Sequence, residues 1–203
     1  MIIPEKKILF VHIPKTGGQS VTKYLLQNLG EKTNLKNSKY GLINNKKSKI
    51  EGPYHFHHLL LREYKSLGLV KNIDDYFKIS VVRNPYSRFV SAFYFNNLQD
   101  KFSYTDVLKQ LPFEDKNLDL YRMFIPQVDY LKIGGKIKID KLFYQENLKE
   151  LFNFFNNEYM MKGNYYTNIS KTTEQKPLTK KDIILINQLY FVDFREFGYK
   201  MIK

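Results

Sequence analysis

The sequence of 203 residues contains no cysteine. Disulfide bonds, thiolate metal ligands and a thiol nucleophile are therefore excluded, and with them a secreted scaffold held together by disulfides. Long apolar runs are also missing, because the apolar stretch near the start spans only about six residues, too few for a signal peptide or a membrane span. We therefore expect a soluble, cytoplasmic protein with no membrane span, long enough to bury a core of its own.

Acidic residues are few relative to basic ones: 33 Lys and Arg stand against 20 Asp and Glu, for a formal net charge of +13. Such a balance raises the question of nucleic acid binding. The lysines are scattered, however, as over residues 36–49 and 132–141, and they form no single dense tract. We therefore favour an ordinary solvated surface, keep an acidic substrate or nucleotide as the second interpretation, and expect no nucleic acid partner.

Strand-like and helix-like segments alternate along the chain. Ile8–Val11 and Tyr76–Val82 have strand character, and each is followed by an amphipathic helix, at Ser20–Leu29 and Tyr86–Asn97. Further helices are expected at Leu59–Gly68, at Leu118–Leu131 (around Tyr121–Phe124, with a break at Pro126), at Asn147–Glu158 and at Thr179–Phe194. A hairpin or strand pair is expected over Leu131–Tyr144. Strands followed by helices predict a single α/β domain over residues 1–203, with a central parallel sheet flanked by helices in three layers.

The segment from Ile8 to Ser20, ILFVHIPKTGGQS, is the most informative part of the chain. Its strand leads through a Pro-Lys-Thr-Gly-Gly turn directly into a helix, whose first N–H groups have no internal partner and whose dipole favours negative charge. Gly17 and Gly18 permit positive φ and leave out the Cβ that would hold a phosphate away, while Lys15 supplies a cation. The turn predicts a phosphate site, although a plain Gly-Gly turn explains this segment alone equally well.

A second anion-directed segment is Val81–Phe93, VVRNPYSRFVSAF. Arg83 leaves the end of a strand with a planar guanidinium that suits a phosphate, and Ser91 follows on the next helix. We interpret Arg88, on the same helix, as a surface or ion-pair residue. Ligands of parallel sheets lie beyond the carboxyl ends of the strands, so we expect both segments to face one ligand that carries two phosphate groups.

Together, HIPKTGGQS and VVRNPYSRFVSAF resemble the motifs of the PAPS-dependent sulfotransferases, in particular the branch with heparan sulfate 2-O-sulfotransferase, other carbohydrate sulfotransferases and bacterial relatives. Further similarities are HLLLREYKSLG from His58, PQVDYL from Pro126, FYQENL from Phe143 and YFVDFREFGY from Tyr190. The resemblance implies a single sulfotransferase domain of P-loop-like fold. It also implies transfer of a sulfuryl group from 3′-phosphoadenosine 5′-phosphosulfate (PAPS) to a hydroxyl, which we expect on a carbohydrate, without a metal.

The resemblance assigns roles to residues of both motifs. The 5′-phosphosulfate would be held by Lys15, Thr16, Gly17, Gly18, Gln19 and Ser20, with Gln19 standing where the family more often has Thr. Arg83 and Ser91 would bind the 3′-phosphate. Ser170 and Lys171 are candidates for a late loop that closes over the nucleotide, and an ordinary polar loop explains them equally well.

Sulfuryl transfer to an alcohol needs a base, and histidine is the natural base near neutral pH. Three of the four histidines cluster at His55, His57 and His58. The resemblance favours His58, which leads the HLLLREY segment, with His57 as the fallback and His55 ranked last. Lys15 would act on the leaving phosphate as it gains charge. No acidic or Cys ligand stands at helical spacing beside these histidines, so we expect no metal site.

Two other functions stay open at this point. A nucleotide phosphotransferase that uses the same turn would depend on Mg²⁺ and prefer ATP, although Lys15 precedes the glycines and the turn is not a Walker A loop. A nucleotide or RNA-binding protein without catalysis would not need His58. The segments Glu31–Gly52 and Asp100–Asn117, which we interpret as loops, carry no signature of the acceptor, although the basic surface would suit an acidic glycan.

Overall fold

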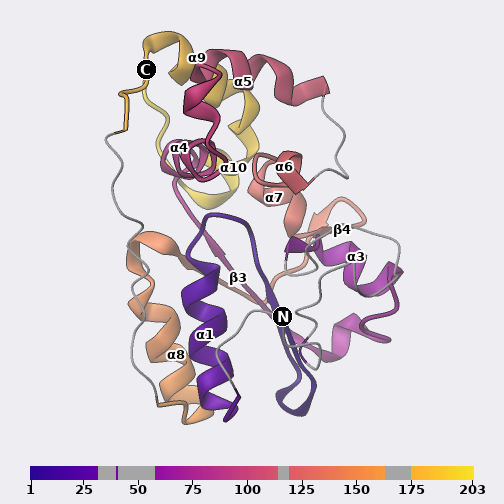
Figure 1. Ribbon diagram of the computed structural model, residues 1–203. Coiled ribbons are helices and arrows are strands. Elements are labelled where there is room, and N and C mark those ends of the chain that lie inside the picture. Colours follow the sequence, from indigo (N-terminus) through magenta and orange to yellow (C-terminus); the bar gives the residue numbers. More distant parts are fainter. Residues whose placement is uncertain (32–39, 41–57, 114–118, 163–174) are drawn as a thin grey trace.

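The computed structural model describes residues 1–31, 40, 58–113, 119–162 and 175–203 (Figure 1). In this part of the chain the central sheet has the strand order β1-β2-β3-β6. The strands β2 (Ile8–Val11), β3 (Phe77–Val82) and β6 (Lys141–Tyr144) run parallel, whereas the short β1 (Ile2–Ile3) is antiparallel to β2. The predicted α/β fold with a central parallel sheet is therefore confirmed for three strands, and β1 is the exception.

Helices cover both faces of the sheet, which explains why β2 is apolar at every position. Ile8 and Phe10 pack into a core with α1 (Gly18–Asn28) and α8 (Lys149–Tyr159), which lie side by side in Figure 1. Leu9 and Val11 point into a second core, on the other face of the sheet. That core includes side chains of α3 (Leu61–Ser66), α7 (Gln127–Tyr130) and α10 (Phe191–Phe197).

A third core lies beyond the carboxyl end of β3, where the chain enters α4 (Pro85–Phe95) (Figure 1). It packs α4 against α5 (Tyr104–Gln110), α9 (Lys180–Leu189) and α10 through aromatic rings, among them Phe93 and Tyr104 with centroids 4.6 Å apart. None of the helices in the described residues is long and apolar enough to cross a membrane. The helices α4, α5, α9 and α10 thus form a layer beyond the carboxyl edge of the sheet.

The remaining short elements are the hairpin strands β4 (Lys132–Ile133) and β5 (Lys136–Ile137), the helix α6 (Asp119–Arg122), and the 3₁₀ turns η1 (Pro4–Lys6), η4 (Ile73–Asp75), η5 (Leu98–Asp100), η6 (Leu111–Phe113) and η7 (Gln145–Asn147). The hairpin turns at Gly134-Gly135, as expected. The strand predicted as its continuation is different, because β6 leaves the hairpin and pairs with β3 in the central sheet.

Two other predictions about elements are wrong in part. Tyr104–Gln110, expected within a loop, is the helix α5, and the hydroxyl of Ser103 caps it by accepting the N–H of Asp106. The helix expected over Thr179–Phe194 is two helices, α9 and α10, which separate at Tyr190. The segment Glu31–Gly52 lies outside the described residues, apart from its first residue and Tyr40.

Arg88 is buried, so its interpretation as a surface or ion-pair residue is wrong. Its guanidinium donates to three main-chain carbonyls: Nε to Pro14 at 3.1 Å, Nη1 to Ile125 at 3.0 Å and Nη2 to Met123 at 3.1 Å. Those carbonyls belong to the turn after β2 and to the segment between α6 and α7. Arg88 therefore ties α4 to both, and it satisfies carbonyls that burial would otherwise leave without partners.

Candidate active site

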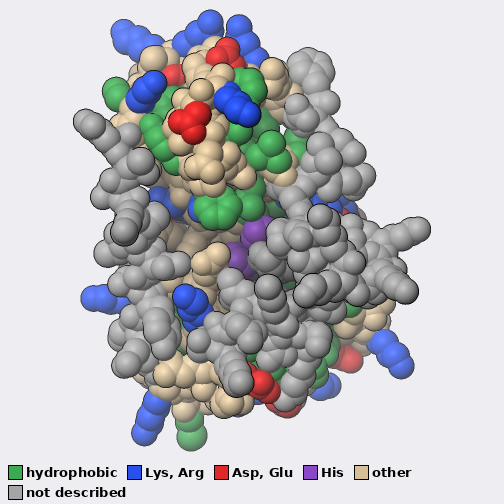
Figure 2. Space-filling model, viewed as in Figure 1, with side chains coloured by type: hydrophobic (Ala, Val, Ile, Leu, Met, Phe, Trp, Pro, Cys, Tyr) green, Lys and Arg blue, Asp and Glu red, His purple; other side chains and the backbone are tan. Residues whose placement is uncertain are grey.

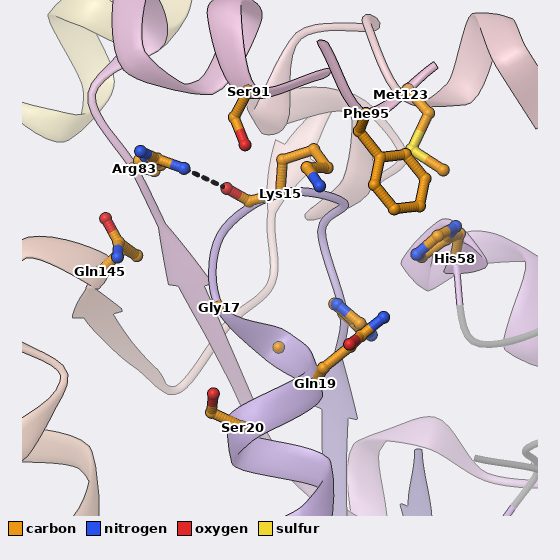
Figure 3. A pocket seen from close by; sticks show the side chains of 12 residues that line it. Lys15, Gly17, Gln19, Ser20, His58, Arg83, Ser91, Phe95, Met123 and Gln145 are labelled. Atoms are coloured by element: carbon orange, nitrogen blue, oxygen red, sulfur yellow. Dashed lines mark hydrogen bonds between the residues drawn. The ribbon is translucent and has the colours of Figure 1, made fainter. Parts of the chain in front are cut away.

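A cavity of about 230 Å³ lies at the carboxyl ends of β2 and β3. Figure 2 shows histidine side chains in a hollow on this face, and Figure 3 shows the lining residues. The cavity is lined by His12, Lys15, Gly17, Gly18, Gln19, Ser20, His58, Arg83, Ser91, Phe95, Met123 and Gln145. The structure thus brings the Lys15 turn, the Arg83 turn and His58 together around one space.

The turn after β2 depends on two residues with left-handed backbone, Lys15 with φ of +67° and Gly17 with φ of +84°. A positive φ is uncommon for a residue with a Cβ, so Lys15 carries some strain. Thr16 is fully buried, and its Oγ1 donates to the carbonyl of Ile13 at 2.8 Å. The side chain of Thr16 therefore closes the turn and does not line the cavity, while α1 begins at Gly18 with its N-terminus toward the cavity.

Gly18 is required by the ring of His12. A Cβ added at Gly18 would lie 2.0 Å from Cδ2 of His12, far inside van der Waals contact. His12 is buried, stacks on Phe10 and meets His58 edge to face with ring centroids 5.1 Å apart. His12 lines the cavity but was not singled out from the sequence, although it stands directly before the turn in the quoted motif.

Lys15 points its ammonium toward the cavity from the turn. Nζ lies 3.7 Å from the centroid of the Phe95 ring on α4, a cation–π contact that holds the side chain in place (Figure 3). Burial, and then the positive charge of Arg83, lower the pKa of Lys15 from 10.5 to about 8. Both causes disfavour the protonated amine, and a bound anion would oppose both.

Arg83 extends from the end of β3, and its Nη1 donates to the carbonyl of Lys15 at 3.2 Å (Figure 3). Its Nε is buried and has no hydrogen-bond partner among the residues that the structure describes. Burial lowers the pKa of Arg83 from its ordinary value. Ser91, on the helix that follows, directs its hydroxyl toward the space between Arg83 and Lys15 (Figure 3). The two predicted anion-binding turns are therefore in direct contact.

His58 is buried at the opposite side of the cavity from Arg83 (Figure 3). Its carbonyl accepts a hydrogen bond from Nη1 of Arg122 at 3.4 Å. The same guanidinium pairs with both carboxylate oxygens of Glu63, at 2.7 and 2.8 Å, and Glu63 in turn accepts the N–H of Leu60 at the start of α3. A bidentate ion pair between α3 and α6 thus holds the main chain at His58.

The other predicted site residues, His55, His57, Ser170 and Lys171, lie outside the described residues. Within the described residues, no group of three or more His, Asp or Glu side chains could hold a metal ion. Phe95, Met123 and Gln145 line the cavity without having been predicted. They come from α4, from the segment after α6 and from the first residue after β6. Of the three, Gln145 lies in the quoted segment FYQENL, where the sequence predicts no role for it.

A model of the sulfotransferase family matches residues 1–200 of the chain. This match covers nearly the entire sequence, so the chain belongs to the sulfotransferase family. No curated protein and no solved structure matches the chain. Family membership indicates a transferase that moves sulfuryl groups to hydroxyl-bearing acceptors, generally with PAPS as the donor. The carbohydrate branch of the family and the P-loop-like character of the fold stay predictions.

We expect Gly18→Ala to destabilise the protein, although alanine in place of glycine ordinarily stabilises a helix by roughly 0.5–1 kcal/mol. The added methyl group would overlap the ring of His12, and overpacking of this kind costs about 1–3 kcal/mol. Urea unfolding would measure the loss. In a His12→Ala background the same change should be neutral or stabilising. An equal loss in both backgrounds would show that His12 is not the cause.

A second prediction concerns Lys15 and pH. Because its pKa is lowered from 10.5 to about 8, the folded protein binds fewer protons than the unfolded chain between these values, so the free energy of unfolding gains a contribution that rises with pH across this window. Lys15→Met removes this contribution. Urea unfolding of both proteins should therefore show the variant favoured most at pH 7, with its advantage shrinking toward pH 10.5. A difference between the two proteins that stays constant from pH 7 to pH 10.5 would contradict the prediction.

Proposed function

We propose that this protein transfers the sulfuryl group of PAPS to a hydroxyl group of a carbohydrate. The observation that carries the proposal is that the Lys15 turn, the Arg83–Ser91 pair and His58 line one cavity. A donor with a phosphosulfate at one end of its ribose and a phosphate at the other needs two anion sites at a short separation. Membership of the sulfotransferase family supports the reaction type.

The residues around the cavity fit such a donor. The N-terminus of α1 offers N–H groups and a favourable dipole for the 5′-phosphosulfate, and Gly17 and Gly18 line the cavity there. The buried Nε of Arg83, without a partner among the described residues, and the Ser91 hydroxyl suit the 3′-phosphate. PAPS supplies a sulfuryl group whose leaving group is a phosphate, and the ammonium of Lys15 would stabilise the charge that develops there.

The acceptor would enter from the side of the cavity where His58 lies. A ring nitrogen of His58 would accept the proton of the acceptor hydroxyl, with His57 as the alternative base. Phe95 and Met123 line the same side, and Phe95 is 54% exposed (Figure 3). An exposed aromatic ring offers a surface on which the apolar face of a sugar ring packs, which favours a carbohydrate as the acceptor.

Nucleotide binding tests the donor. 3′-Phosphoadenosine 5′-phosphate (PAP) should raise the melting temperature, since a ligand at a hundredfold excess over its Kd adds about 2.7 kcal/mol of stability. Arg83→Ala should weaken PAP binding by roughly tenfold or more, because it removes charge-assisted hydrogen bonds. The control Arg195→Ala, on the exposed face of α10, should bind PAP like the wild type. Stabilisation by ATP with Mg²⁺ but not by PAP would favour a phosphotransferase instead.

Turnover tests the base. With PAPS and a panel of carbohydrate acceptors, His58→Ala should lower the rate of sulfuryl transfer by roughly 10²–10⁴-fold, the usual contribution of a general base. PAP affinity should stay close to that of the wild type, because His58 lies on the side of the cavity away from Arg83 (Figure 3). Unchanged turnover in His58→Ala would transfer the role to His57. PAP binding without any turnover would indicate a nucleotide-binding protein.

A further inference from the structure

The main chain of Arg83 pairs with a single buried side chain, that of Gln127 on α7. Oε1 of Gln127 accepts the N–H of Arg83 at 2.9 Å, and Nε2 donates to the carbonyl of Arg83 at 2.8 Å. This is the pattern that a neighbouring strand would supply, and it continues the order of β3 by one residue beyond the sheet. Gln127 has no exposed surface, so water does not compete for these two bonds.

Gln127 is held in turn by Asp193 on α10. The Asp193 carboxylate accepts the N–H of Gln127 at 2.8 Å, the N–H of Val128 at 2.9 Å and a longer bond from Nε2 of Gln127 at 3.4 Å. Asp193 is fully buried, and burial raises its pKa. A buried carboxylate is costly in free energy unless hydrogen bonds satisfy it. By accepting the first N–H groups of α7, Asp193 on α10 links α10 to α7 and, through Gln127, to the Arg83 turn.

The next residue, Asn84, is held from the other side by Glu146. Oε1 of Glu146 accepts the N–H of Asn84 at 2.8 Å, and Oε2 accepts the hydroxyl proton of Tyr199 at 2.8 Å. The negative charge of Glu146 also opposes the lowering of the Arg83 pKa by burial. The turn after β3 is thus held by side chains from three segments far apart in the chain, around residues 127, 146 and 193–199.

The main chain of Arg83 makes two hydrogen bonds to Gln127, whereas its guanidinium makes one among the described residues. One hydrogen bond, to the carbonyl of Lys15, restrains it, and its Nε has no partner among the described residues. The anchored main chain fixes the position from which the side chain extends, so a shift of that main chain would move the guanidinium relative to a bound phosphate.

We propose that Gln127 and Asp193, supported by Glu146, are positioning residues that aim Arg83 at the 3′-phosphate of the donor. This inference rests on the proposed function, because it concerns the same nucleotide. It assigns a role to PQVDYL, FYQENL and YFVDFREFGY, three segments that the motif analysis marked without a function. None of these side chains touches the donor in the proposed arrangement, and they act through the main chain of Arg83 and Asn84.

The test is selectivity for the 3′-phosphate, measured as the affinity for PAP divided by the affinity for adenosine 5′-phosphate. Gln127→Met keeps the side-chain volume and removes both bonds to Arg83, so the ratio should fall roughly tenfold or more, the usual order of loss for a misplaced binding group. Affinity for adenosine 5′-phosphate should stay near the wild-type value. Equal weakening of both nucleotides would indicate a purely structural role and overturn the proposal.

A matched pair of variants covers the case in which Gln127→Met does not fold. Asp193→Asn and Asp182→Asn each remove the charge of a buried carboxylate near the start of a helix. The Asp182 carboxylate accepts hydrogen bonds from Thr179, at the start of α9, and from Thr105 on α5, whereas that of Asp193 accepts the N–H groups of Gln127 and Val128 beside the Arg83 turn. Both should lower stability, and only Asp193→Asn should lower the selectivity ratio. A fall in both, or in neither, would overturn the proposal.

A double-mutant cycle separates positioning from independent binding. In an Arg83→Ala background, Gln127→Met should cost no further selectivity, because the residue through which Gln127 acts is gone. Additive losses would overturn the proposal. A wild-type protein without preference for PAP would end both this inference and the proposed function, whereas a preference that Gln127→Met and Asp193→Asn leave unchanged would end the positioning role alone.

Discussion

β2 and β3 run parallel and in register, with Phe10 opposite Ile79 and Val11 opposite Ser80. The buried hydroxyl of Ser80 also donates a hydrogen bond to the carbonyl of Val11 at 2.7 Å. Because the two strands end at the same edge, the turns that follow them leave the sheet side by side, and Arg83 reaches the carbonyl of Lys15. A slip of one residue would exchange the side chains that β2 presents to the two cores. Both sets are apolar, so their close packing, and not their polarity, fixes the register on which the geometry of the site depends.

The cavity concentrates positive charge where water is partly excluded. Burial lowers the pKa of both Lys15 and Arg83, and the charge of Arg83 lowers that of Lys15 further. The negative charge of Glu146 opposes the lowering of the Arg83 pKa, but the oxygens of Glu146 already accept hydrogen bonds from Asn84 and Tyr199. The folded protein therefore carries an unfavourable electrostatic free energy at this edge of the sheet. The proposed donor, a doubly phosphorylated nucleotide, would relieve it by placing negative charge beside both side chains.

Local patterns predicted the elements that position the site. The strand Ile8–Val11 matches β2 at both ends, and the helix predicted from Thr179 begins there, with a capping box of Thr179 and Asp182 at the start of α9. The motifs also brought Lys15, Arg83 and His58 into one candidate site, since each follows a recognisable strand or heads a recognisable segment. The sequence analysis did not predict the helix α5, although Ser103 and Asp106 form a capping box. Its apolar face is short, consisting of Tyr104, Val107 and Leu108, and it lies within a largely polar stretch. Phe95 and Met123 enter the cavity only through tertiary packing, which no short window of sequence contains, whereas Gln145 lies in the quoted segment FYQENL without a predicted role.

Buried polar side chains make most of the contacts that could not be predicted from the sequence. Arg88, Gln127 and Asp193 would each be assigned to the surface from residue type alone, because such side chains are seldom fully buried. Each is buried here because it meets main-chain groups that have no partner in a helix or strand: carbonyls between α6 and α7, the end of β3, and the first N–H groups of α7. Their partners lie between 35 and 74 residues away in the sequence. The buried polar side chains that support the cavity are thus the ones whose roles are hardest to predict from the sequence.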